Sequence, residues 1–378
     1  MKIMKIVRDA YRDYRTPQSS QTNSPWERAA RLAGSIVRPG PDVSRLKAEE
    51  VVATLREQSS YAMTMVQELA QLTPHPEHAK KHGDVLCDVS IVDRAGWAMW
   101  AARGMEDLIG ANRAEPIDNE PDPTDVNPSV EITAVLTFLA QKTLGQFIPH
   151  QYTGNPNEEG ELGNLVLVAP NILATQRSMA VNLTEFSLWV STHELTHALQ
   201  FAHAPWLAQY MRDIADELIR GFDSETSLVQ WARALSSSAR GQQSVIEYML
   251  SEVQHAKLEE ITALMSVLEG HADVVMDLIP SSVLPAQRVL RRKFESRKRD
   301  LNRTAELFSR VSGLDAKKNQ YKVGAQFVRG VRSRAGLESF NRVFIGPEYL
   351  PTLDELSSPA QWLERTAHIP GDTQGTEE

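Results

Sequence analysis

Hydrophobic residues recur every three or four positions over most of the chain, as they do on helices that bury one face. Two of these periodic stretches begin with a residue that can cap a helix, Ser44 and Asn182. A different pattern, a short apolar run with β-branched residues bounded by glycine and proline, spans 162–170 and predicts a strand. The sequence therefore predicts a mainly α fold of the α+β type with a small β-sheet. The helical stretches are 44–72, 95–109, 130–145, 182–204 and 261–279.

Polar segments at the two ends set the expected limits of the folded part. Residues 1–24 carry mixed charge followed by a polar run, which predicts a flexible N-terminal extension, and residues 369–378 are expected to form a disordered tail. The acidic, proline-rich segment 115–128 is expected to be a surface loop, because helices of similar character flank it. We therefore predict one large domain over 25–368.

The centre of the chain carries the motif HELTH, in which His193 and His197 are four residues apart and Glu194 follows the first histidine. Histidines at this spacing lie on one face of a helix and can bind one zinc ion together. Glu194 occupies the position from which a carboxylate can activate a zinc-bound water. Both histidines fall on the apolar stripe of a helix that ends before Pro205, so their side chains are expected to face inward.

Catalytic zinc needs a third protein ligand, and three candidates are open. His203 stands where the longer motif HExxHxxGxxH has its last histidine, but Gln200 replaces the glycine that would turn the chain back to the metal. The helix predicted over 261–279 offers Glu269 and His271, which point in different directions.

Glu269 is the preferred third ligand, because Asp273 lies one helical turn further along the same face. One carboxylate can bind zinc while the other accepts the free ring N–H of a ligating histidine and fixes its orientation. This Glu-x-x-x-Asp spacing is that of gluzincins. Gly270 costs the same helix about 1 kcal/mol relative to alanine, which indicates close packing or room for a neighbour.

Tyr321 is a further candidate catalytic residue. Its hydroxyl could stabilise the oxyanion that zinc-dependent hydrolysis generates, a role often taken by tyrosine or histidine. The alternative, which we favour from the sequence, is that Tyr321 packs in the interior with its hydroxyl hydrogen-bonded.

Short stretches spread along the chain form an ordered pattern: 37–40, 92–94 with 96–97, 145–146, 168–171, 189–201, 205–207, 264–277, 313–317 with 320–321 and 324, and 340–343. In this order they resemble bacterial zincin-like metallohydrolases, and the resemblance covers about 25–365. It implies one largely helical domain with a zincin metal-site core and a peptidase or other hydrolase activity. His203 is not part of the family pattern, which further favours Glu269. Proteins of this family are often labelled as associated with biosynthesis of a deazaflavin cofactor, a label that we attribute to gene association and not to mechanism.

Composition and charge indicate what kind of protein carries this site. The chain has 378 residues, 42% hydrophobic and 24% charged, as is typical of a globular protein with a sizeable core. Its net charge of −9 argues against a nucleic-acid partner, and we interpret the basic stretch 288–303 as one solvated helix face. Cys87 is the one cysteine, and no apolar run is long enough for a signal peptide or a membrane span. We therefore expect a cytoplasmic protein without a membrane partner.

The leading hypothesis is a zinc-dependent hydrolase, acting as a metallopeptidase on a peptide or small amide. His193, His197 and Glu269 would hold Zn²⁺, with Asp273 orienting one histidine. Glu194 would take a proton from water and later carry it to the leaving group. A second hypothesis is a non-catalytic protein in which zinc stabilises a zincin fold that binds a partner, and a third is metal-free packing of the same residues. The sequence carries no signal for the oligomeric state or for cleavage specificity.

Overall fold

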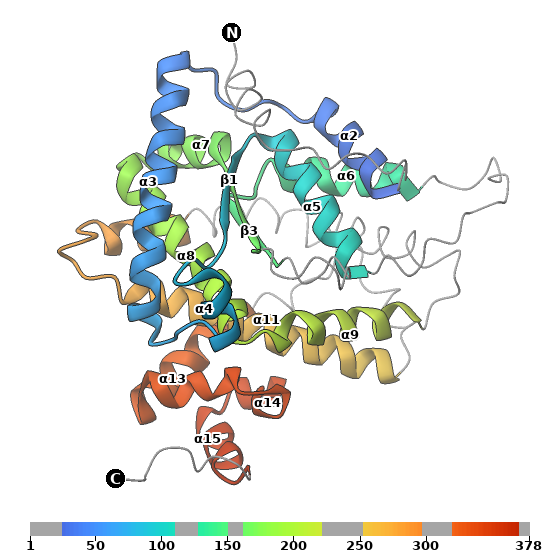
Figure 1. Ribbon diagram of the computed structural model, residues 1–378, viewed down its shortest axis with the longest axis vertical. Coiled ribbons are helices and arrows are strands. Elements are labelled where there is room, and N and C mark those ends of the chain that lie inside the picture. The colour runs from blue at the N-terminus through green and yellow to red at the C-terminus, as the bar shows by residue number, and fades with distance from the viewer. Residues whose placement is uncertain (1–24, 110–127, 150–161, 221–251, 297–319, 370–378) are drawn as a thin grey trace, which may run out of the picture.

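The computed structural model describes residues 25–109, 128–149, 162–220, 252–296 and 320–369 (Figure 1). Helices dominate these residues, which confirms the mainly α prediction, and none of the described helices has the length and apolar character to span a bilayer. The predicted extension 1–24 and almost all of the predicted tail lie outside the described residues, so those limits stay predictions. The helices are α2 (Pro25–Ile36), α3 (Arg45–Ala70), α4 (Pro76–His82), α5 (Arg94–Ile109), α6 (Pro128–Ala140), α7 (Ala169–Met179), α8 (Leu183–His203), α9 (Trp206–Arg220), α11 (Glu252–Asp277), one over 287–296, α13 (Gln320–Asn341), η4 (Arg342–Phe344), η5 (Pro347–Tyr349), α14 (Leu353–Leu356) and α15 (Pro359–Ala367).

Helix α3 begins where the sequence predicts it. The hydroxyl of Ser44 accepts a hydrogen bond from the backbone N–H of Lys47 at 3.2 Å, which satisfies one of the free donors at the helix start. Along its length α3 packs against α8, and the hydroxyls of Ser59 and Ser191 lie 3.1 Å apart within this buried contact. The longest N-terminal helix therefore supports the helix that carries the HELTH motif.

Three strands form the sheet, β1 (Asp88–Val92), β2 (Gly145–Ile148) and β3 (Asn164–Val168), in the order β1-β3-β2. Strand β3 lies in the centre, parallel to β1 and antiparallel to β2. The strand predicted at 162–170 is therefore β3, although its last two residues already belong to α7. The helix predicted over 130–145 was too long, because α6 ends at Ala140 and the unpredicted strand β2 follows.

The sheet separates two hydrophobic clusters, because successive side chains of β3 point to opposite faces. Leu165 and Leu167 pack into a cluster with residues of α3, α8 and α11, whereas Val166 and Val168 pack with residues of α2, α5 and α6. Figure 1 shows α2, α5 and α6 together on one side of β1 and β3, with α3 and α8 on the other side. All five residues of β3 are buried, as expected for a strand covered on both faces.

Helices α11 and α13 approach one another at two glycines. A Cβ atom on Gly270 would lie 2.3 Å from the carbonyl carbon of Gly324, and one on Gly324 would lie 1.8 Å from the carbonyl oxygen of Ser266. Backbones can come this close only where side chains are missing. The close packing predicted at Gly270 is confirmed, and the contact fixes α13 against the helix that carries Glu269.

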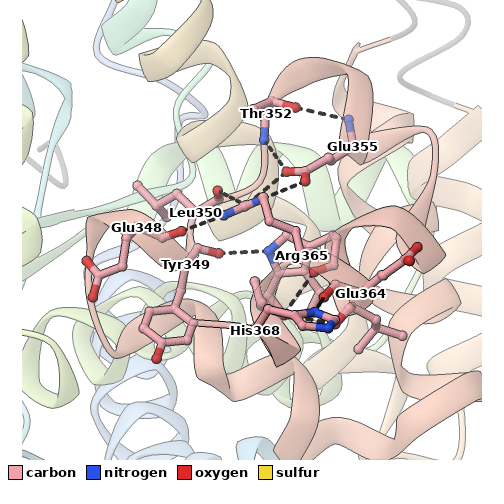
Figure 2. A network of polar contacts seen from close by, with 11 residues as sticks. Glu348, Tyr349, Leu350, Thr352, Glu355, Glu364, Arg365 and His368 are labelled. Atoms are coloured by element: carbon pink, nitrogen blue, oxygen red, sulfur yellow. Dashed lines mark hydrogen bonds and ion pairs between the residues drawn. The ribbon is translucent and has the colours of Figure 1, made fainter. Parts of the chain in front are cut away.

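A single arginine joins the C-terminal elements, as Figure 2 shows. Arg365 of α15 donates two hydrogen bonds to the carboxylate of Glu355, at 2.6 and 2.9 Å. The same guanidinium donates to the backbone carbonyls of Glu348 at 2.6 Å and Leu350 at 2.8 Å. Glu355 also completes a capping box with Thr352 at the start of α14. One side chain therefore ties α15 to α14 and to the segment around η5.

Candidate metal centre

Helix α8 supplies the HELTH motif. The side chain of Asn182 accepts a hydrogen bond from the backbone N–H of Glu185 at 3.0 Å, and the helix ends at His203, two residues before Pro205. Most of its residues are buried, including the apolar stripe that contains Phe186 and Trp189. The predicted start, end and inward stripe of this helix are confirmed, and they direct the motif toward α11.

His193, His197 and Glu269 meet between α8 and α11. The Nε2 atom of His193 lies 3.4 Å from Oε2 of Glu269, and the Nε2 atom of His197 lies 3.6 Å from Oε1. One ligand atom from each residue lies within 4.8 Å of the other two. The structure thus brings together the two histidines and the carboxylate that the sequence favours as third ligand.

These three side chains suit a metal ion such as zinc. Ligands around tetrahedral zinc, at about 2.0–2.1 Å from the metal, lie about 3.3 Å from one another, which is close to the two distances between histidine and glutamate. Two imidazoles and one carboxylate also leave a fourth position, as in catalytic zinc sites. Within the described part of the chain, no other group of histidine, cysteine, aspartate and glutamate has this proximity.

The charges at the site act on one another. Burial alone would lower the pKa of His193, but the hydrogen bond and charge of Glu269, together with the charges of Glu194 and Asp273, outweigh burial and raise this pKa to about 9. Burial raises the pKa of Glu194, and the charge of Glu269 adds to this effect, although His193 and His197 act against it. A carboxyl group with a raised pKa binds a proton more readily near neutral pH, as a general base must.

Gly145, the first residue of β2, lies directly against Glu194. A Cβ atom at this position would lie 2.8 Å from Cγ and 3.0 Å from Cδ of Glu194. The glycine therefore leaves the space that the carboxylate occupies, and it brings strand β2 to the edge of the site. Further along, the ring of Phe147 in β2 lies 5.6 Å from that of Phe201, so β2 follows α8 past the motif.

Gln200 contacts His197, a contact that is not predicted from the sequence. Its Oε1 atom lies 2.9 Å from Nδ1 of His197, and its side chain is completely buried. The available signal was its place three residues after His197, on the inward face of α8, where the longer motif has glycine. A polar residue at such a position needs a buried hydrogen-bond partner, and the histidine provides one.

Asp273 does not orient a histidine as predicted. Its carboxylate faces Arg291, with Oδ1 3.6 Å from Nη1, and Arg291 also donates to its backbone carbonyl at 2.8 Å. The Nδ1 atoms of the two histidines contact other groups, the sulfur of Met276 at 3.2 Å from His193 and the amide of Gln200 near His197. Asp273 therefore acts on the site through its charge, which contributes to the raised pKa of His193.

The other candidate residues lie outside the group of three. The Nδ1 atom of His203, at the end of α8, is 2.6 Å from the backbone carbonyl of Thr73. His271 is completely buried and contacts Gln200 and two phenylalanine rings, and its burial lowers its pKa to about 3. Tyr321 belongs to α13, but its side chain lies outside the described residues, so its catalytic role stays a prediction.

Comparison with known proteins gives a family match and a fold match. The family described as "Zincin-like metallopeptidase" matches residues 25–363. A crystal structure of a protein from Chloroflexus aurantiacus, described as a "putative hydrolase with a novel fold", is similar with a TM-score of 0.61 and 24% sequence identity, over 91% of this chain and 98% of that chain. This similarity shows a shared fold, whereas no curated protein matches the chain significantly. Because the family match extends over almost the whole described chain and includes the metal-binding group, the chain belongs to the zincin-like metallopeptidase family.

Proposed function

We propose that this protein is a zinc-dependent hydrolase that cleaves peptide or amide bonds. The observation that carries the proposal is the group of His193, His197 and Glu269. Glu194 lies next to it on α8, the helix that carries both histidines. The family match and the name of the similar protein from Chloroflexus aurantiacus support a hydrolytic reaction. A non-catalytic zinc site would not need a half-buried carboxylate of raised pKa next to the ligands.

Each residue has a distinct task in this proposal. His193 and His197 present their Nε2 atoms toward Glu269, and these three side chains would hold zinc. When bound, zinc would polarise a substrate carbonyl and lower the pKa of water to about 7. Glu194 would accept a proton from the attacking water and then donate it to the leaving nitrogen, for which its raised pKa is suited.

The edge of β2 that pairs with no described strand is the proposed place for an extended substrate. The central strand β3 is paired with β1 on one side and β2 on the other, so it offers no edge for a peptide. Strand β2 has a strand partner on one side only among the described strands, and its Gly145 lies against Glu194. A peptide added to this edge would make backbone hydrogen bonds with β2 while one of its amide bonds passes the metal ligands.

Replacement of Glu194 by glutamine tests the proposal. The change keeps the shape of the side chain and removes its ability to accept a proton, so hydrolysis should fall at least about 100-fold while zinc content stays unchanged. Zinc is measured by elemental analysis after purification without chelator, and turnover by cleavage of an unbiased peptide library. Glu259→Gln, at an exposed position of α11, is the matched control and should behave as wild type.

Two outcomes would contradict the proposal. Undiminished hydrolysis by Glu194→Gln would exclude Glu194 as the proton acceptor. Stoichiometric zinc together with no cleavage of any peptide or amide by the wild type would instead favour a zinc-stabilised binding protein.

A further inference from the structure

The side-chain amide of Gln200 makes three contacts, one with His197 of its own helix α8 and two with residues of helix α11. Its Oε1 atom lies 2.9 Å from Nδ1 of His197. Its Nε2 atom lies 3.0 Å from the backbone carbonyl of Leu268 and 3.0 Å from Nδ1 of His271. Gln200 and His271 are both completely buried, so these protein contacts stand in for hydrogen bonds to water.

The contact with Leu268 fixes which way the amide faces. A backbone carbonyl can only accept a hydrogen bond, so the atom of Gln200 that faces it must be the NH₂ group. The second N–H of that group then points at His271, whose Nδ1 must accept and whose proton is therefore on Nε2. The carbonyl oxygen of Gln200 is left to face His197.

That oxygen determines where His197 carries its proton. An amide oxygen can only accept, so Nδ1 of a neutral His197 must be the donor. The other ring nitrogen, Nε2, then keeps its lone pair, and this is the atom that lies 3.6 Å from Glu269. The orientation of His197 thus depends on a backbone carbonyl one residue before Glu269 in the sequence.

We infer that Gln200 is a positioning residue that holds His197 in its Nδ1–H tautomer and presents its Nε2 lone pair to a metal ion. The inference rests on the metal site of the proposed function but does not depend on hydrolysis. Leu268 and His271 belong to α11, the helix that carries Glu269, so the amide also sets the position of the two ligand-bearing helices relative to one another. His271, a candidate ligand from the sequence, acts here as a buried acceptor whose ring contacts those of Phe340 and Phe344.

The first test measures the tautomer in metal-free protein. In ¹⁵N-histidine-labelled wild type, at a pH where the ring is neutral, His197 should be protonated at Nδ1, with its signals assigned by their loss in His197→Gln. Gln200→Met, which has similar length and no amide, should lose this preference. Protonation of wild-type His197 at Nε2, or an unchanged tautomer in Gln200→Met, would overturn the inference.

The second test measures zinc binding by competition with a chromophoric chelator. Loss of a partner that orients a ligating histidine should weaken zinc binding about 10- to 100-fold in Gln200→Met. Thr192→Val removes a different buried hydrogen bond of α8, from the Thr192 hydroxyl to the carbonyl of Leu188, and should keep wild-type affinity. Equal losses in both variants would show a general effect of destabilising α8 and would contradict the inference.

A third variant separates the two contacts of the amide on α11. His271→Phe removes one acceptor but keeps the carbonyl of Leu268. His197 should therefore remain protonated at Nδ1, and the zinc affinity should stay within about twofold of wild type. A loss of zinc affinity as large as that in Gln200→Met would show that the carbonyl of Leu268 does not orient the amide of Gln200. If the wild type binds no zinc, the proposed function fails, whereas the tautomer measurement still decides the role of Gln200.

Discussion

The side chain of Glu194 occupies space that a glycine at position 145 leaves open. Burial raises the pKa of this carboxyl, and the adjacent histidines counteract the effect, so its position relative to them controls how readily it binds a proton. A methyl group at Gly145 would lie 2.8 Å from Cγ of Glu194, closer than side-chain carbons normally approach. Residue 145 should therefore affect catalysis without contacting the metal.

Gly145→Ala is expected to reduce kcat about 100-fold, because a displacement of about 1 Å of a catalytic group can cost that much. Zinc content should remain at the wild-type level, since His193, His197 and Glu269 lie on other elements. Steady-state kinetics and elemental analysis measure the two effects separately.

Gly104→Ala provides the control for the added methyl group. Its Cβ would lie 3.1 Å from Cγ2 of Ile148, at the opposite end of β2 from Gly145, so this variant packs tightly against the same strand away from Glu194. It should retain near wild-type kcat. Wild-type kcat in Gly145→Ala, or loss of zinc from it, would contradict a role of Gly145 in placing Glu194.

At the residue scale, the sequence predicts those site residues whose relative positions follow from spacing along a single helix. The spacing of His193 and His197 depends only on helical geometry, and Glu269 follows from the apolar period of a second helix and from its spacing to Asp273. The partners Gln200 and Gly145 could not be assigned, because their contacts depend on how α8 crosses α11 and where β2 lies. The same reason explains why the predicted role of Asp273 was wrong. Its carboxylate faces Arg291, which lies on the helix over 287–296, and the sequence does not predict where that helix packs.

At the scale of elements, the capped helices were predictable and the short strand was not. Ser44 and Asn182 mark the starts of α3 and α8 through hydrogen bonds within a few residues. Strand β2 has four residues and follows α6 closely, and its conformation depends on pairing with β3 some twenty residues later. A strand that depends on a distant partner leaves little local signal in the sequence.

The C-terminal elements depend on the ion pair between Glu355 and Arg365. Burial would raise the pKa of Glu355, but the hydrogen bonds from Arg365 and from the backbone of Thr352 outweigh it and lower this pKa below its ordinary value of 4.5. A lowered folded-state pKa means stability that is fully present above pH 4.5 and is lost as the pH falls through the folded-state value.

Glu355→Gln should lower the free energy of unfolding by about 1–2 kcal/mol at neutral pH, a value reduced from that of a buried charged pair because the side chain of Arg365 is 38% exposed. The difference from wild type should shrink as the pH falls below 4.5. Urea denaturation at several pH values measures it. Glu364→Gln, at an exposed position of α15, serves as control, and a difference that is constant over pH would contradict the ionic explanation.

At the scale of the whole molecule, the two hydrophobic clusters have different relations to the metal site. The cluster with α2, α5 and α6 lies on the face of β3 away from α8, whereas the cluster with α3, α8 and α11 contains the helices that carry all three ligands. A metal ion bound by His193, His197 and Glu269 would therefore join two helices of the larger cluster.

Zinc should therefore stabilise the folded protein. A ligand that binds only the folded state adds about 2.7 kcal/mol at a free concentration of 100 times its Kd. Thermal unfolding with buffered zinc should show a higher Tm than unfolding with a chelator, and the difference should grow with the logarithm of free zinc. Glu269→Gln removes a charged ligand and should abolish most of this increase, while Glu259→Gln on the same helix should keep it. Equal Tm values for the wild type with and without zinc would show that these three residues do not hold the metal, because binding to the folded state alone must raise Tm.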